Sequence, residues 1–283
     1  MKQILLSIIF YFLTIIITAQ DFTEIGEIGN FSNSASFSIN PSGFIFIADS
    51  EKNEIYKIDT LGTNLKFIGG YGWSDSAFDN PSDVFATTLN VYVTDKNNHR
   101  IQIFDKDLNY LSQFRTDKSE NTNLQFAYPE CLAVSNQGDL YILDSDNSRI
   151  LKFGLTGNFL LEIGGNNAGE YSLSNPINFA ISDDGKLFVI DAGFILVFDQ
   201  YGTGLMKFKT SFEASNLSIS KSKIILNSPD QIEIIDLINR SNDSRLIKST
   251  QLNINSSIKE AKLFNNKMYV LTETSIHIYN FTK

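Results

Sequence analysis

Six short segments of the sequence place a polar residue at one shared position, directly before an apolar step. These residues are Ser36, Asp83, Cys131, Asn178, Asn216 and Glu260. Carboxylate and carboxamide oxygens are the ligands that a hard cation such as Ca²⁺ prefers. If the six segments converge, Asp83, Asn178, Asn216 and Glu260 would form a candidate ligand or calcium site. The alternative is that these polar side chains contact only water.

Other catalytic patterns are absent from the sequence. There is no Gly-x-Ser-x-Gly nucleophile elbow and no phosphate-binding Gly-x-x-x-x-Gly-Lys loop. Two histidines, His99 and His277, are too few for a His-rich metal centre, and we interpret both as structural. The single cysteine, Cys131, excludes an intramolecular disulfide. A net charge of −9 argues against nonspecific binding to nucleic acid.

One glycine-rich segment, expected to be a loop, contains two aromatic residues, Tyr71 and the only tryptophan, Trp73. Aromatic side chains on a loop are frequent anchors for a binding partner. The sequence therefore offers Tyr71 and Trp73 as candidate partner-binding residues. The alternative is that Trp73 packs between structural repeats.

A hairpin pattern recurs along the chain and must position these residues. In its clearest copy, residues 91–105, two short β-branched and aromatic runs flank a polar turn that contains Asp95 and Arg100. Residues 140–154 repeat this pattern with Asp144 and Arg149. Because an aspartate accepts backbone N–H groups in turns and an arginine carries several donors, we expect both pairs to tie the turn to its neighbour. This role is structural rather than catalytic.

The repeat has a period of 46 to 49 residues, set by the turn aspartates at 49, 95, 144 and 191. Such a period built from short strands is typical of β-propeller blades, and the sequence after the N-terminal apolar segment has no convincing helical run of 12 residues. Residues 22–28 form a strand without a hairpin partner, while the last blade is one strand short. Pairing the two predicts an all-β, six-bladed propeller of four-stranded blades, closed by the N-terminal strand. We expect residues 250–254 to be the fourth strand of the fifth blade.

The N-terminal segment has the features of an export signal. Residues 1–20 combine one lysine, a long apolar run and a Thr-Ala-Gln ending, which resembles signals of Gram-negative bacteria of the Bacteroidetes type. We therefore predict a signal peptide at 1–20, a single domain at 21–283, and a periplasmic or secreted protein with no membrane span in its mature form. An uncleaved anchor is the alternative.

The repeats resemble the NHL repeat family of β-propellers. The resemblance lies in Asn80-Pro81 followed by Asp95 and Arg100, and in Asp144 and Arg149, and it covers about residues 40–200. It implies a non-enzymatic binding or scaffold module for a protein, peptide or glycan, without a cofactor. The Glu, Asn, Asn, Asp set is also similar to the metal centre of six-bladed lactonases, although the order of these residues differs. The alternative function is therefore a calcium-dependent lactonase or hydrolase with its site in the central channel.

Overall fold

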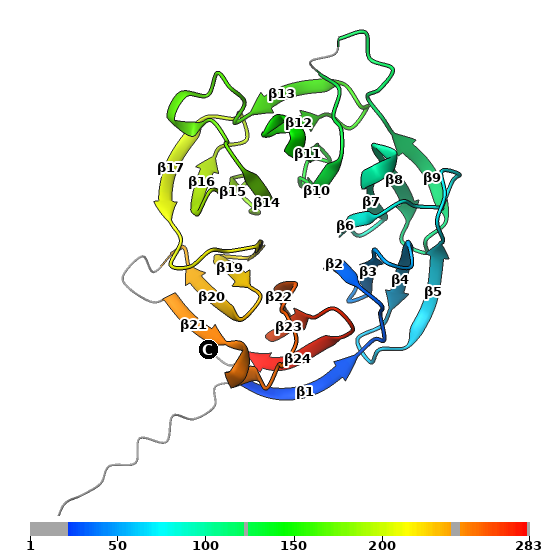
Figure 1. Ribbon diagram of the computed structural model, residues 1–283, viewed down its shortest axis with the longest axis vertical. Coiled ribbons are helices and arrows are strands. Elements are labelled where there is room, and N and C mark those ends of the chain that lie inside the picture. Colours follow the sequence, from blue (N-terminus) through cyan, green and yellow to red (C-terminus); the bar gives the residue numbers. More distant parts are fainter. Residues whose placement is uncertain (1–21, 122–123, 239–243, 282–283) are drawn as a thin grey trace, which may run out of the picture.

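The computed structural model describes residues 22–121, 124–238 and 244–281, which form six four-stranded antiparallel sheets around a central axis (Figure 1). This confirms the predicted six-bladed β-propeller. The predicted signal peptide at 1–20 lies outside the described residues. Within the described ranges, no helix is long and apolar enough to cross a membrane.

Each blade is a meander whose first strand lies next to the channel. Blade one comprises β2 (Ser34–Ile39), β3 (Ile45–Asp49), β4 (Glu54–Ile58) and β5 (Asn64–Gly69). Blade two comprises β6 (Pro81–Ala86), β7 (Asn90–Asp95), β8 (Arg100–Asp105) and β9 (Tyr110–Phe114). Blade three comprises β10 (Pro129–Val134), β11 (Leu140–Asp144), β12 (Arg149–Phe153) and β13 (Phe159–Ile163). Blade four comprises β14 (Pro176–Ile181), β15 (Leu187–Asp191), β16 (Phe194–Phe198) and β17 (Gly204–Lys209). Blade five comprises β18 (Asn216–Ser220), β19 (Lys223–Ser228), β20 (Gln231–Asp236) and β21 (Ser244–Lys248). Blade six comprises β22 (Glu260–Phe264), β23 (Lys267–Leu271), β24 (Ile276–Phe281) and β1 (Phe22–Ile28).

The hydrophobic core lies between adjacent blades. Because each sheet is covered on both sides, the second strands are mostly buried, and β3, β11 and β15 are buried along their whole length. Phe46 of blade one, for example, packs with Val84 and Val93 of blade two. Complete burial of one such side chain contributes about 1.5–3 kcal/mol, so the interfaces between blades hold the ring together.

The N-terminal strand closes the ring as predicted. Strand β1 pairs antiparallel with β24, from Phe22 opposite Phe281 to Ile28 opposite Ile276, with an irregularity between Glu24 and Gly26. It is the outermost strand of blade six (Figure 1). This pairing joins the two ends of the described chain and leaves no gap between the first and last blades.

The prediction for the end of blade five was wrong. The fourth strand is Ser244–Lys248, and a 3₁₀ turn at Ser249–Leu252 follows it. Asn253, with φ 56°, ends that turn in the left-handed conformation. The alternating apolar residues Leu252 and Ile254 that suggested a strand are instead buried in the core between blades five and six.

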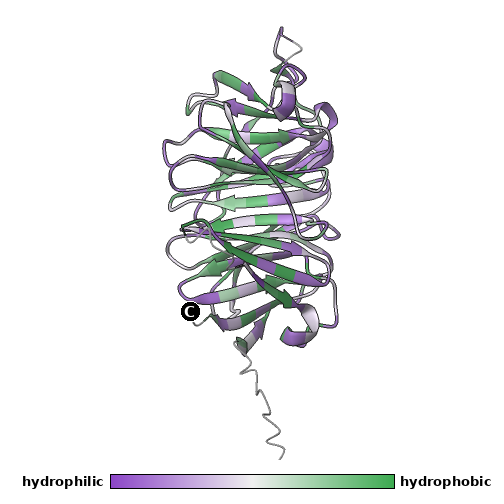
Figure 2. Cartoon of the chain, turned by 90° about the vertical axis from the view of Figure 1, so that its left-hand side faces the viewer, coloured by the Kyte–Doolittle hydropathy of each residue, from purple (hydrophilic) through white to green (hydrophobic). Residues whose placement is uncertain are grey.

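The two flat faces of the disc carry different connections, because consecutive strands cross it in opposite directions (Figure 2). The turns between second and third strands and the loops between blades lie on one face, which we call the Trp73 face. The turns between first and second strands and between third and fourth strands lie on the other, which we call the Lys221 face. Strand β1 enters from the Lys221 face, because it runs antiparallel to β24.

Candidate functional site

A buried ion pair lies at the turn of blade two. Asp95 ends β7 and Arg100 begins β8, and a 3₁₀ turn joins them, so that the two residues are direct cross-strand partners. Arg100 Nε donates to Asp95 Oδ2 at 2.7 Å, and both side chains are almost completely buried. A buried pair is stable only where its remaining donors and acceptors are also satisfied.

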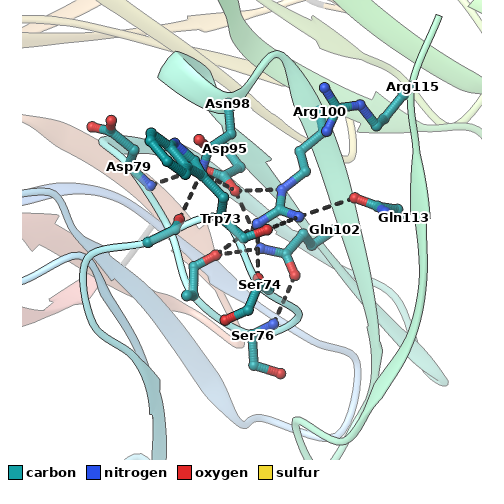
Figure 3. A network of polar contacts seen from close by, with 12 residues as sticks. Trp73, Ser74, Ser76, Asp79, Asp95, Asn98, Arg100, Gln102, Gln113 and Arg115 are labelled. Carbon is teal, nitrogen blue, oxygen red and sulfur yellow. Dashed lines mark hydrogen bonds and ion pairs between the residues drawn. The ribbon is translucent and has the colours of Figure 1, made fainter. Parts of the chain in front are cut away.

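The remaining donors of Arg100 bind the backbone of the loop between blades one and two (Figure 3). Its two terminal nitrogens donate to the carbonyl oxygens of Trp73, Ser74 and Ala77, each at 2.9 Å. Gln102, also buried, donates to the Ala77 carbonyl at 2.7 Å and accepts from the Ser76 N–H at 2.9 Å. Side chains of the blade therefore take the place of regular secondary structure in fixing this loop.

Asn98 holds the loop at a further point. Its Nδ2 donates to the Gly72 carbonyl at 2.9 Å and also contacts the Asp95 carboxylate. Phe78, which is fully buried, anchors the far end of the loop in the core between blades one and two. The loop is thus attached at both ends and along its length.

The aromatic side chains of this fixed loop point to solvent. Trp73 is 73% exposed and Tyr71 is 70% exposed. This exposure excludes the alternative that Trp73 packs between blades. A rigid backbone with exposed aromatic rings is the arrangement expected of a preformed binding surface.

A second aromatic contact continues this surface toward blade three. Tyr128, 41% exposed, donates its backbone N–H to His99 Nδ1 at 3.1 Å, and the two rings meet edge-on with centroids 4.3 Å apart. His99 follows Asn98, which binds the Trp73 loop. We call Tyr71, Trp73, His99 and Tyr128 the aromatic strip. The sequence indicated a structural role for His99 but not its contact with Tyr128.

The turn aspartates share one local role. Asp49, Asp95, Asp144 and Asp191 are all buried, and each accepts a backbone N–H from the segment that leads into its own blade. The donor residues are Ser32, Asp79, Ala127 and Ser174. The repeated aspartate therefore positions the entry of the inner strand beside the turn.

The arginine of blade three makes fewer bonds to its loop. Arg149 Nε donates to Asp144 at 2.9 Å, and one terminal nitrogen donates to the Gln125 carbonyl at 3.0 Å. The other pairs with Glu162 at 2.7 Å. The predicted structural pairs are thus both formed, but the arginine of blade two binds more carbonyl groups of its loop than the arginine of blade three.

The six predicted channel residues lie on the first strands, and most of them link one strand to the next. The Ser36 hydroxyl lies between two carboxylates, 2.6 Å from Asp83 Oδ1 and 3.2 Å from Glu260 Oε2. Asp83 also accepts from the Leu132 N–H, and Glu260 accepts from the Phe37 N–H. Burial, followed by the nearby Glu260 charge, raises the pKa of Asp83 to about 6.

The other channel residues make weaker or fewer links. Asn178 Oδ1 accepts from the Leu217 N–H at 3.2 Å, and Cys131 Sγ lies 3.9 Å from the Phe179 carbonyl. Asn216 Oδ1 has no partner within the described part of the chain. No group of three or more His, Cys, Asp or Glu residues among those described could hold a metal ion. A calcium site at Asp83, Asn178, Asn216 and Glu260 stays a prediction.

Comparison with known proteins supports the repeat assignment. A family model described as NHL repeat matches residues 78–104 and 126–153. Protein brain tumor of Drosophila melanogaster is 31% identical over 149 residues, which cover 51% of this chain but only 14% of that protein.

Solved structures share the fold at low identity. A streptogramin B lyase structure aligns with a TM-score of 0.62 at 12% identity, over 92% of this chain and 98% of the other. A catalytically inactive virginiamycin B lyase from Staphylococcus aureus with Quinupristin gives 0.61 at 12% identity, over 89% of this chain and 81% of the other. At this identity the likeness shows the propeller fold and carries no argument about chemistry.

Proposed function

Because the chain is an NHL-repeat β-propeller, we propose that it is a non-enzymatic binding module that docks a protein partner on its aromatic strip. The observation that carries this proposal is the exposure of Tyr71 and Trp73 on a loop fixed by Arg100, Gln102 and Asn98. Peptide and glycan partners remain alternatives that the experiment below separates.

A preformed loop favours binding because little free energy is needed to order it. Ordering a flexible loop on association costs free energy that reduces affinity. Here the loop backbone already has its hydrogen-bond partners in the free protein, so this cost is small. Aromatic residues such as tryptophan and tyrosine contribute most per side chain in protein interfaces.

We also propose that the protein is exported to the periplasm or beyond. The support is the charge, apolar run and Thr-Ala-Gln ending of residues 1–20. The intact mass of the protein isolated from fractionated source cells tests this. A mass that corresponds to cleavage near residue 20, in an extracytoplasmic fraction, is expected. A full-length cytoplasmic species would contradict export.

Affinity capture with matched variants tests the binding proposal. The wild-type protein, Trp73→Ala and Leu89→Ala are each incubated with the extracytoplasmic fraction of the source cells, and the captured partner is then purified and titrated. Leu89 is 68% exposed on the opposite face and serves as the control. We expect Trp73→Ala to weaken binding by about thirtyfold, as a hot-spot residue does, and Leu89→Ala to have no effect. Equal affinity of all three proteins would refute the proposal, and capture of only glycan or short peptides would change the partner class.

A further inference from the structure

Three hollows adjoin one another on the Lys221 face, two of them between blades four to six and one at the channel mouth. The largest, about 620 Å³, lies between blades five and six and is lined by Leu263, Phe264 and Phe281. A second of about 410 Å³ lies between blades four and five and is lined by Leu205, Met206 and Ile238. The third, about 370 Å³, is the channel mouth itself. Lys221 lines all three, and we call the joined hollows the Lys221 recess.

Short turns account for the position of the recess. Blades five and six connect their first two strands through only residues 221–222 and 265–266. Lys221, Asn265 and Asn266 adopt positive φ, which permits such tight connections. Blades three and four use the longer turns 135–139 and 182–186 at the same place. The surface is therefore lower over blades five and six, where the repeat pattern of the sequence fades.

The charges of the recess leave Lys221 without a counter-ion. Lys186 pairs with Asp184, Lys223 with Asp236 at 2.9 Å, and Lys262 with Glu260 at 2.8 Å. The exposed Lys221 ammonium makes no ion pair or side-chain hydrogen bond within the described residues. Asp83 also lines the channel mouth, and Asp183 lines both the channel mouth and the blade four–five groove, but neither forms an ion pair with Lys221. A second cation, Arg245, lines the blade five–six groove.

The walls on both sides of Lys221 include accessible apolar side chains among polar ones. Leu205 is 45% exposed, Met206 37% and Ile238 76%, although all three line one groove. On the other side, Leu263, Phe264 and Phe281 are each partly exposed. Each groove by itself has the volume of a typical small-molecule pocket. A single small anion would contact Lys221 and leave both apolar grooves empty.

We propose that the Lys221 recess binds an extended peptide segment in which an acidic residue is flanked by apolar residues. The acidic side chain pairs with Lys221, and the apolar side chains occupy the two grooves beside it. The recess and the aromatic strip lie on opposite faces, so this site is independent of the proposed partner-binding surface. With both sites occupied, the propeller would bridge two partners.

Selection from a random 12-residue phage-displayed peptide library tests this proposal on the full chain. Enriched peptides are synthesised with a fluorophore and titrated by anisotropy against the wild type, Lys221→Glu and two controls. One control, Lys118→Glu, makes the same charge change at an exposed lysine that lines none of the three hollows. The other control, Trp73→Ala, alters the opposite face.

The expected result is a consensus of Asp or Glu between apolar residues, at least about tenfold weaker binding to Lys221→Glu, and unchanged binding to both controls. Because Lys221 has a positive φ, Lys221→Glu is first checked for folding by thermal melting. Ile238→Asp provides a second variant at an exposed side chain and should weaken binding about fivefold. Enrichment of peptides without an acidic residue, equal affinity for wild type and Lys221→Glu, or no enrichment above background would each overturn the proposal.

Discussion

Blades two and three contain the two clearest copies of the same repeat, yet they use it differently. In both, an aspartate at the end of the second strand pairs with an arginine at the start of the third. In blade two the arginine binds three carbonyl groups of one loop, whereas in blade three it binds one. The shared motif therefore builds the turn but does not determine what the arginine holds.

The difference lies in two neighbouring positions. Gln102 and Gln113 of blade two correspond to Leu151 and Glu162 of blade three, and each set forms a cross-strand pair. Gln102 completes the attachment of the Trp73 loop, and Gln113 accepts from Arg100 at 3.0 Å without adding charge. Glu162 instead draws Arg149 into a second, partly exposed ion pair. Residues that vary between repeats thus convert a structural turn into a support for an exposed loop.

Removal of the two arginines should show the largest effects. Arg100→Met leaves the buried Asp95 without its cation and three carbonyl groups without their arginine donor, so we expect a loss of about 3–5 kcal/mol in the free energy of unfolding. Arg149→Met should cost less, about 2 kcal/mol, because the partly exposed Glu162 carboxylate can be hydrated by solvent when its partner is removed. Urea unfolding of both variants measures the difference. Equal losses would show that the loop bonds of Arg100 contribute nothing beyond the shared ion pair.

Much of the fold follows from the sequence, while the site follows only in part. The blade period and the unpaired strand at 22–28 specify six blades and their closure. The strand expected at 250–254 failed because Leu252 and Ile254 are buried by a 3₁₀ turn rather than by a sheet. Tyr71 and Trp73 could be named from composition, but their exposure depends on how the loop folds over blade two.

Gln102 could not be identified from the sequence. It alternates with Ile101 and Ile103, a pattern that suggests a solvent-facing side chain in a half-buried strand. In a propeller the neighbouring blade and loop cover that face, so Gln102 is fully buried. The Lys221 recess was missed for a similar reason, because it depends on the short turns of two adjacent blades.

Blades two and three also differ at the channel-lining position of their first strands, where blade two has Asp83 and blade three has Cys131. The pKa of Asp83 is raised to about 6, above its usual value of 3.8. Its stabilising contribution is therefore fully present below about pH 4 and is lost as the pH rises through 6, at a cost of about 1–3 kcal/mol.

Urea unfolding of wild type and Asp83→Asn between pH 4.5 and 8 tests this sign. We expect the wild type to lose stability relative to Asp83→Asn as the pH rises, because only the wild type must ionise beside Glu260. The Cys131 thiol, whose pKa is raised by burial, stays protonated over this range, and Lys262, which pairs with Glu260, is present in both proteins. A stability difference that does not vary with pH would contradict the raised pKa.

An exchange of the two variable positions should have a smaller effect. Gln102→Leu gives blade two the residue of blade three and removes side-chain bonds to Ser76 N–H and Ala77 O, for an expected loss of about 1–2 kcal/mol. Hydrogen exchange at the Ser76 amide should become faster. The reverse change, Leu151→Gln, buries an amide without an evident partner and should also destabilise. Unchanged exchange at Ser76 would show that Arg100 alone fixes the loop.

The smallest expected effect on the free energy of unfolding is that of removing Trp73, whose ring is exposed rather than packed. Trp73→Ala should change the free energy of unfolding by less than about 0.5 kcal/mol, because the ring is mostly in solvent. Tyr171, in the corresponding loop between blades three and four, is a matched control, because its ring packs edge-on against Phe198 with centroids 6.0 Å apart. Tyr171→Ala should therefore cost about 1–2 kcal/mol. If thermal or urea unfolding showed equal losses, Trp73 would be a packing residue in solution, and the contrast between a loop that displays its aromatic residue and one that buries it would not hold.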